Sequence, residues 1–164
     1  MSAADEAVLV VWQASFDDAE TLADLAVRCE ADLAGGRRGG QALASEAWFG
    51  LPSLADGSSG AAWLAGWNGV VVGVAAATLG KPNPLEPAVA QLGMLWVDPE
   101  WRELGAGGEL IEAVVAWAKS QGAAALDAGA LPGDRPLKRL LESSGFKARL
   151  ITMRTEFELG VDGI

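Results

Sequence analysis

The sequence predicts a mixed α and β domain in which helices flank a central sheet. Two patterns alternate along its 164 residues: apolar side chains at helical spacing, and short valine-rich runs typical of strands. The clearest strands flank Asn68-Gly69, and the clearest helix follows the glycines at 105–108. Apolar residues make up 51% of the chain and charged residues 21%, which is ordinary for a globular protein. The length fits one domain spanning residues 1–164.

The N-terminal part predicts a strand and then a helix. Residues 7–15 contain the apolar run Val8-Leu9-Val10-Val11-Trp12, and Ser15 followed by Asp18 is typical of a helix start. The apolar face of the helix consists of Leu22, Leu25, Ala26, Cys29 and Leu33. Glycines in residues 35–40 end this helix, and residues 42–49 predict a second, short one.

Residues 60–80 carry no charge and are long enough to cross a membrane. Asn68-Gly69 lies at the centre of this stretch, however, and is the strongest short signal for a tight hairpin turn. Valines and tryptophans on both sides favour strands over a helix. We therefore expect two paired strands here and no membrane segment.

The second half continues with a proline-rich turn at 81–87 and a strand at 89–97. The helix after the glycines is expected to end near Ser120-Gln121-Gly122, and residues 123–130 predict another strand. Asp134, with Pro136 two residues later, is typical of a helix start. That helix is expected to end at Ser144-Gly145, and residues 146–159 predict a closing strand.

Charge and composition exclude several kinds of function. With 12 basic and 22 acidic residues the net charge is −10, which disfavours nucleic-acid binding and favours a cationic partner. The chain has no histidine and no tyrosine, so histidine-dependent catalytic triads are excluded. Cys29 is the single cysteine, which leaves a poor ligand set for zinc, and we expect no metal. The acidic start, with Asp5 and Glu6, does not fit a secretory signal, so we expect a cytoplasmic protein.

The turn at Gly105-Ala106-Gly107-Gly108 predicts an anion site. Small residues allow a ligand to approach the backbone, and the helix that follows begins with unpaired N–H groups. A dinucleotide site is an alternative, supported by Asp127 20 positions after Gly107, but Leu110 stands where the third glycine of that fingerprint belongs. No Gly-Lys-Ser/Thr follows, which excludes a P-loop. A purely structural turn is the remaining alternative.

The spacing Arg102-x-x-Gly105-x-Gly107 resembles the acyl-CoA pyrophosphate loop of the GNAT acetyltransferase superfamily. A second feature of that family is a late helix ending in Gly-Phe before the closing strand, which Gly145-Phe146 matches. The resemblance implies an α+β fold: a mixed, mostly antiparallel central sheet of about six to seven strands flanked by about four helices. It also implies acetyl-CoA as cosubstrate and an amine as acceptor.

The family pattern implies particular site residues. The backbone of Leu95, Trp96 and Val97 would bind pantetheine, and the Leu95 N–H would stabilise the oxyanion. Around the pyrophosphate the implied residues are Arg102, Glu103, Leu104, Gly105, Ala106, Gly107 and Gly108. On this reading we expect Gly107→Glu to abolish acetyl-CoA binding and to leave the fold intact.

Three positions depart from the family pattern. Leu141 stands at the usual tyrosine acid, and Gln91 stands at the glutamate base of histone-type members. Asp134 occupies a frequent asparagine position, where it either contacts CoA or only caps its helix. An amide cannot take a proton at neutral pH, so the base is not evident.

Two functions follow from this pattern. The first is an N-acetyltransferase that acts on a primary amine by direct attack in a ternary complex. The second is a catalytically weak or inactive acyl-CoA-binding sensor or interaction module. The acceptor site would lie in the loops 35–40 and 81–87 and the short helix with Glu46, Trp48 and Phe49. The protein is expected to be a monomer or a homodimer.

Overall fold

The computed structural model describes residues 8–34, 57, 60–80, 85–151, 153, 155 and 157. In this part of the chain five strands form one sheet in the order β1-β2-β3-β4-β5. They are β1 (Leu9–Gln13), β2 (Gly60–Trp67), β3 (Val70–Leu79), β4 (Val89–Val97) and β5 (Ala125–Ala128). The first four are antiparallel neighbours, and β5 joins β4 in parallel. The predicted α+β class is confirmed.

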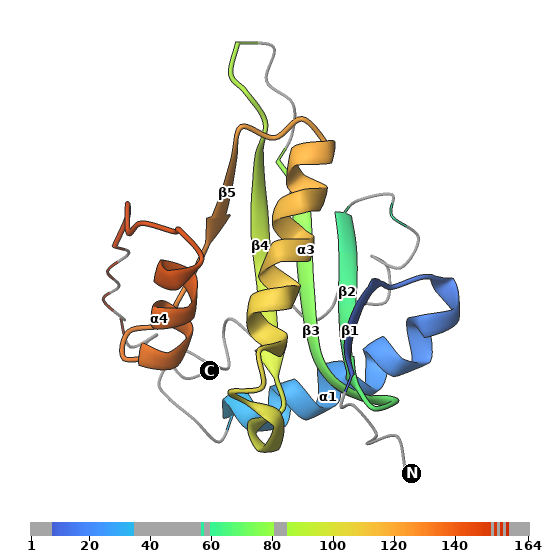
Figure 1. Ribbon diagram of the computed structural model, residues 1–164. Coiled ribbons are helices and arrows are strands. Elements are labelled where there is room, and N and C mark those ends of the chain that lie inside the picture. The colour runs from blue at the N-terminus through green and yellow to red at the C-terminus, as the bar shows by residue number, and fades with distance from the viewer. Residues whose placement is uncertain are drawn as a thin grey trace, which may run out of the picture.

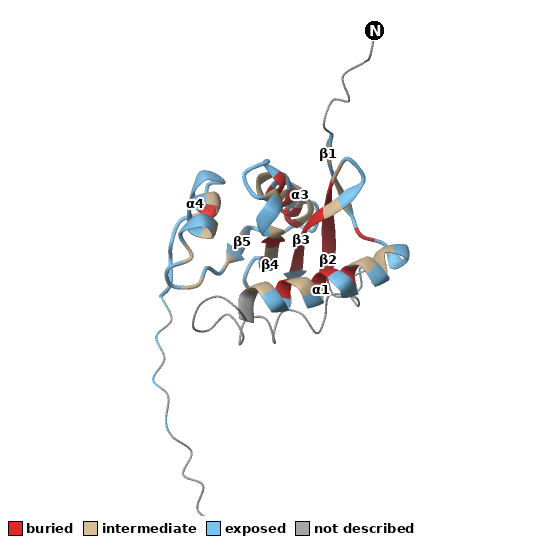
Figure 2. Cartoon of the chain, turned by 90° about the horizontal axis from the view of Figure 1, so that it is seen from below, coloured by how far each residue is buried: buried red, intermediate tan, exposed pale blue. Residues whose placement is uncertain are grey.

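Helices cover both faces of this sheet. The helix α3 (Ala106–Ser120) crosses one face, and α1 (Ala19–Ala34) lies on the other (Figure 1). The short helix α4 (Arg135–Ser143) lies beside β5 and contacts the first turn of α3. Seen end-on, the buried strands lie between α1 and α3 (Figure 2). The predicted helix at 42–49 lies outside the described residues.

The start of α1 follows from Ser15. The Asp18 carboxylate accepts a hydrogen bond from the Ser15 N–H at 2.9 Å, which satisfies a donor that the helix cannot pair itself. A 3₁₀ turn at Phe16–Asp18 then leads into α1. Leu22, Leu25 and Cys29 are buried against the sheet, as the sequence pattern predicts.

The predicted hairpin is confirmed. Asn68 (φ 48°) and Gly69 (φ 83°) both have left-handed backbone angles, which a tight hairpin turn requires and which these two residue types tolerate. Strands β2 and β3 are almost wholly buried, so their lack of charge reflects burial between two helix layers. No helix among the described residues is long and apolar enough to cross a membrane.

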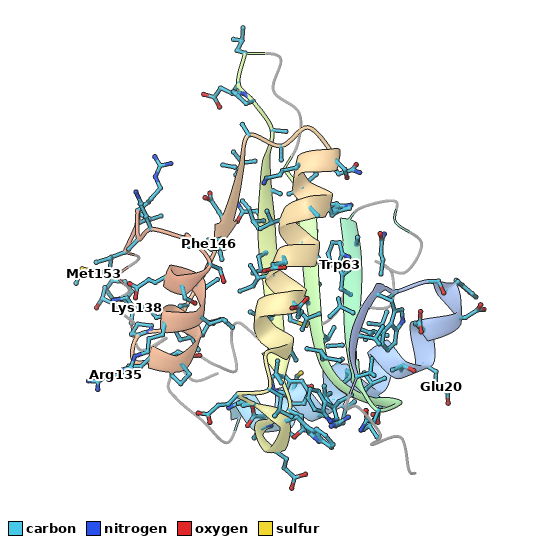
Figure 3. All side chains as sticks on the ribbon, viewed as in Figure 1. Glu20, Trp63, Arg135, Lys138, Phe146 and Met153 are labelled. Atoms are coloured by element: carbon cyan, nitrogen blue, oxygen red, sulfur yellow. The ribbon has the colours of Figure 1, made fainter. Side chains whose placement is uncertain are left out.

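Two apolar clusters, one on each face, hold the layers together. The α1-side cluster contains Leu64, Val74, Met94 and Trp96, which pack under α1. The α3-side cluster contains Val72, Leu92 and other strand residues, which pack under Leu110, Ile111 and Val114 of α3. Trp63 of β2, labelled in Figure 3, meets Trp117 of α3 edge to face, and the ring centroids are 5.5 Å apart. The clusters fix where the first turn of α3 sits relative to β4.

The C-terminal segment differs from the prediction. The described residues from Phe146 onward, 146–151, 153, 155 and 157, form no strand, so the described sheet has five strands and not six or seven. Phe146 packs against the α3-side cluster, but Leu150 and Ile151 are each 85% exposed. Strand propensity stabilises a strand only where a neighbouring edge pairs with it, and these residues have no such pairing in the described chain.

Candidate functional site

The two parallel strands at one end of the sheet diverge. Strand β5 pairs with only the first four residues of β4, from Val89 opposite Ala125 to Leu92 opposite Ala128. Strand β4 continues to Val97 with β3 on its other side (Figure 1). The second half of β4 therefore presents a backbone edge that no described strand covers, next to the loop that leads into α3.

The direction of the backbone groups on this edge follows from one hydrogen bond. The Asp98 N–H donates to the Val72 carbonyl of β3 at 2.8 Å. Because N–H groups alternate in direction along a strand, the N–H of Trp96 also points toward β3, whereas those of Leu95 and Val97 point away from it. Leu95 thus presents an N–H toward the divergence. The Trp96 N–H points toward β3, so it cannot bind pantetheine as the family pattern implies.

The loop from Asp98 to Gly105 turns the chain from β4 into α3. The Asp98 carboxylate accepts from the Glu100 N–H at 3.0 Å and so caps a short 3₁₀ turn, Pro99–Trp101. Glu103 (φ 73°) and Gly105 (φ 90°) are both left-handed, and a non-glycine residue in this region is uncommon. Leu104 is exposed on this loop, and the loop ends with Gly105 at the N-cap of α3.

The first turn of α3 carries N–H groups that no described residue accepts from, in the place where the sequence predicts them. The Glu109 N–H is bonded to the Gly105 carbonyl at 3.2 Å, and the N–H groups of Ala106, Gly107 and Gly108 precede the first such bond. These donors and the helix dipole favour an anion at this end. The three glycines nevertheless have different roles in the structure.

Gly107 lies against α4. A Cβ placed on it would lie 2.7 Å from Leu140 Cδ2, because α4 packs directly against this turn. This Leu140 atom is the end of a flexible, half-buried side chain that can move aside, so Gly107→Glu remains a prediction that probes the anion site and the α4 contact together. A Cβ on Gly108 meets nothing within 4 Å, so Gly108 is the position where a substitution tests the anion site alone.

Arg102 does not extend freely into solvent. Its Nε donates to the Val97 carbonyl and its Nη2 donates to Asp32 of α1, both at 2.9 Å. The side chain therefore folds back over the end of β4 and fixes the loop to α1. The Arg102 side chain thus holds the turn in place, and its guanidinium charge is paired with the Asp32 carboxylate.

A polar cluster joins α1 to the end of β4. Asp32 also accepts from the Trp96 indole N–H at 2.9 Å, and Arg28 of α1 pairs with Asp98 while lying 5.6 Å from the centre of the Trp96 ring. Sequence reasoning missed this cluster, because its members are separated by 64–70 positions and come from segments read independently. The cluster fixes the position of the loop that leads into α3.

We expect Asp32→Asn to lower the free energy of unfolding by about 1 kcal/mol and to weaken acetyl-CoA binding several-fold. The amide keeps one acceptor but loses the charge that holds Arg102, and the side chain is 33% exposed, which limits the effect. Urea unfolding followed by tryptophan fluorescence measures the first quantity. Asp24→Asn is the matched control, because Asp24 is 72% exposed and lies 3.9 Å from Arg28. Equal effects of the two substitutions would contradict a positioning role for Asp32.

Two of the positions that depart from the family pattern have structural roles. The Asp134 carboxylate accepts from the Leu137 N–H at 3.2 Å and caps α4. Leu141 is buried in the α3-side cluster, where it packs as an ordinary core residue.

The third departure, Gln91, has an acidic neighbour on the next strand. Gln91 of β4 lies opposite Asp127 of β5, and its Nε2 is 3.4 Å from Asp127 Oδ2. Both side chains are exposed. The sequence offered Asp127 only as a possible ribose ligand, because the parallel register of β4 and β5 could not be read from it.

Cys29 is buried in the α1-side cluster and is not a nucleophile. Burial raises the pKa of its thiol, and the nearby Asp32 carboxylate raises it further. Nearby arginines act in the opposite direction but are outweighed. The thiol is therefore protonated at neutral pH.

We expect the native protein to react with a thiol-specific disulfide reagent on the order of 100-fold more slowly than the urea-unfolded protein. The absorbance of the released thiolate measures both rates. A native rate equal to the unfolded rate would contradict the buried, protonated state of Cys29.

The predicted acceptor region lies mostly outside the described residues, which include only Leu85, Glu86 and Pro87 of its loops. Among the described residues no group of three or more carboxylates or thiols is placed to hold a metal ion. The described part of the site is therefore the edge of β4, the first turn of α3, and the Gln91–Asp127 pair.

Comparison with known proteins agrees with this geometry. A model of the acetyltransferase (GNAT) family matches residues 25–146. No curated protein sequence matches the chain. Among solved structures, the fold is similar to that of aminoglycoside N-acetyltransferase AAC(6')-Iy in complex with CoA, with a TM-score of 0.69, 19% identity, and coverage of 95% of this chain and 100% of that one.

Two further structures show the same fold similarity. One is the aminoglycoside acetyltransferase HMB0005 from an uncultured soil metagenomic sample, with a TM-score of 0.70, 20% identity, and coverage of 92% of this chain and 99% of that one. The other is the ribosomal-protein-alanine N-acetyltransferase from Brucella melitensis biovar Abortus 2308, with a TM-score of 0.66, 18% identity, and the same two coverages, 92% and 99%.

Proposed function

Because the chain belongs to the GNAT family of acetyltransferases, we propose that it transfers an acetyl group from acetyl-CoA to a primary amine by direct attack in a ternary complex. The observation that carries the proposal is an edge of β4 that no described strand covers, next to N–H groups of α3 that no described residue accepts from. One surface thus offers donors for an amide-rich chain and for an anion. A pantetheine arm and a pyrophosphate have this combination of groups.

The residues present fit such a molecule in two places. Ala106, Gly107 and Gly108 supply N–H groups for the pyrophosphate, and the open edge at Leu95 and Val97 supplies strand-like hydrogen bonds for the pantetheine amides. The Val97 carbonyl already accepts from Arg102, so Val97 contributes its N–H alone. Acetyl-CoA, when bound, supplies the activated thioester.

On this proposal the Leu95 N–H stabilises the negative charge that develops on the thioester oxygen as an amine attacks. A preorganised backbone donor of this kind is worth about 2.7–4 kcal/mol in the transition state. Positioning the two reactants in one site contributes further acceleration. A side chain that protonates the leaving thiolate is not required, because a thiolate is a good leaving group and water can protonate it.

Two measurements test the proposal. The melting temperature of the purified protein is expected to rise with acetyl-CoA and with CoA, but not with NAD or ATP, because a ligand that binds only the folded state stabilises it. Thiol release from acetyl-CoA is then followed with three acceptors in separate reactions. They are the aminoglycoside sisomicin, free lysine, and a peptide with an N-terminal alanine. A thermal shift without thiol release would favour the acyl-CoA-binding module, and no shift would overturn CoA binding altogether.

A further inference from the structure

The Gln91–Asp127 pair lies one residue before the point where β4 and β5 diverge. The last paired residues are Leu92 and Ala128, and Gln91 opposite Asp127 is the pair before them. Beyond this point β4 continues toward Leu95, whose N–H faces the divergence. The pair thus borders the divergence toward which the Leu95 N–H points.

Both side chains of the pair project from the sheet face opposite α3. Leu126 and Ala128 pack in the α3-side cluster, so Asp127 between them points to the other face. Leu92 packs in the same cluster, and its neighbour Gln91 likewise points away from α3. A cosubstrate held at the first turn of α3 and an acceptor arriving on the α1 side would then approach each other from different sides of the divergence.

Asp127 differs from the other carboxylates that lie beside the sheet. Asp32 and Asp98 pair with arginines, and Asp134 is occupied in capping α4. Within the described part of the chain, the polar partner of Asp127 is the Gln91 amide, which carries no charge. No described cation thus neutralises Asp127, and the pair presents a negative charge on this side of the described sheet.

We propose that Asp127 binds the ammonium group of the acceptor and takes its proton, so that β5 supplies the carboxylate that β4 lacks at Gln91. This inference rests on the proposed transferase function and deepens it by assigning a proton acceptor and a cationic acceptor class. Gln91 is a positioning residue in this arrangement, because its amide orients the carboxylate. The substrate class is a primary amine that is protonated in solution.

The step balances without a further reactant. The ammonium gives one proton to Asp127, which passes it to solvent, and the neutral nitrogen then forms a bond to the thioester carbonyl carbon. The carbon–sulfur bond breaks, and the electron pair leaves with sulfur as a thiolate. The second proton lost by the nitrogen ends on that thiolate through water. The products are an amide, CoA with a free thiol, and one proton released to solution.

The test moves the carboxylate from one strand to the other. Asp127→Asn keeps the shape of the side chain and removes the charge, and the double variant Asp127→Asn/Gln91→Glu restores a carboxylate on β4. Glu112→Gln is the control, because Glu112 is exposed on α3 and its loss changes the net charge by the same amount. Thiol release is measured for each protein with whichever of sisomicin, the alanine peptide or lysine the wild type acetylates. Acetyl-CoA binding is measured in parallel by thermal shift.

We expect Asp127→Asn to lower kcat/KM by about 100-fold or more, with an unchanged thermal shift from acetyl-CoA. The double variant is expected to recover most of the loss, which a merely structural role for Asp127 would not allow. Wild-type activity in Asp127→Asn, or no recovery in a folded double variant, would overturn the inference alone. Acetyl-CoA binding with no transfer to any of the amines by the wild type would overturn the transferase function, and the role of Asp127 with it.

Discussion

Replacing Gly108 with glutamate is expected to abolish acetyl-CoA binding and to leave the chain folded. A Cβ at Gly108 meets nothing within 4 Å, so the substitution creates no clash. Gly108 is the third residue of α3, where a glutamate reaches back to the N-cap N–H and places its negative charge at the end of the helix. The new carboxylate would therefore occupy the anion site of its own helix.

The expected loss is large because two effects add. The pyrophosphate loses charge-assisted hydrogen bonds to the first turn and meets a like charge, which together cost about 3 kcal/mol or more, equivalent to about 100-fold in affinity. Thermal shift and fluorescence titration with acetyl-CoA measure this. Gly108→Ala is the control: alanine favours the helix by about 0.5–1 kcal/mol and adds no charge, so binding is expected to persist. Wild-type affinity in the glutamate variant would place the pyrophosphate elsewhere.

Local signals in the sequence predicted the parts of the fold that local physics determines. Asn68-Gly69 predicted the hairpin because both residues tolerate left-handed angles, and the structure has φ 48° and 83° there. Asp134 predicted the start of α4 because its carboxylate can accept from an N–H three residues later. The strand at 89–97 was predicted with the bounds that the structure gives β4. Each of these depends on residues close together in the chain.

Contacts between distant segments could not be predicted in the same way. Arg28 with Asp98, Asp32 with Arg102, and Gln91 opposite Asp127 are separated by 36–70 positions. Each is set by the packing of α1 on the sheet or by the register of β5 on β4. Periodicity predicts which face of an element is buried, but it gives no information on which polar residues meet at its edges.

The predicted closing strand was wrong for a related reason, because a strand also depends on residues far away in the chain. Residues 146–159 alternate and are rich in strand-forming side chains, and this predicted a strand. A strand also needs a neighbour whose backbone groups are placed to pair with it, and the described residues from Phe146 onward have none. Met153 and Phe157 are 90% and 83% exposed, so apolar character alone did not bury them.

Residues of one sequence motif can also have different structural roles that the motif's spacing does not reveal. Gly107 and Gly108 are adjacent in the glycine turn, yet Gly107 makes room for Leu140 and Gly108 borders open space. Arg102 belongs to the same motif, and its side chain holds the loop against Val97 and Asp32. The resemblance predicts an anion site at this turn, and the packing of α4 and α1 around it indicates which substitutions would probe binding and which would probe folding.

Leu110→Ala is expected to lower the free energy of unfolding by about 2–5 kcal/mol. Leu110 is fully buried, and its Cδ1 lies 3.3 Å from where a Cβ on Gly73 would be, because the glycine lets α3 approach β3 closely. Removing the side chain leaves a cavity between α3 and the sheet, and close packing on both sides keeps the cavity from closing fully. A loss of this size is a large fraction of the total stability of a single domain.

Urea unfolding followed by tryptophan fluorescence measures the effect, with the slope of the transition expected to be unchanged. Leu104→Ala is the control, because Leu104 is 42% exposed on the loop and its truncation is expected to stay within about 0.5 kcal/mol. If Leu110→Ala does not fold, Ile111→Val removes one methyl group from the same cluster, at an expected cost of about 0.5–1.5 kcal/mol. A loss at position 110 no larger than at position 104 would contradict the packing of α3 on β3. That packing holds the first turn of α3 beside the open edge of β4, so the same variant is expected to bind acetyl-CoA more weakly even where it remains folded.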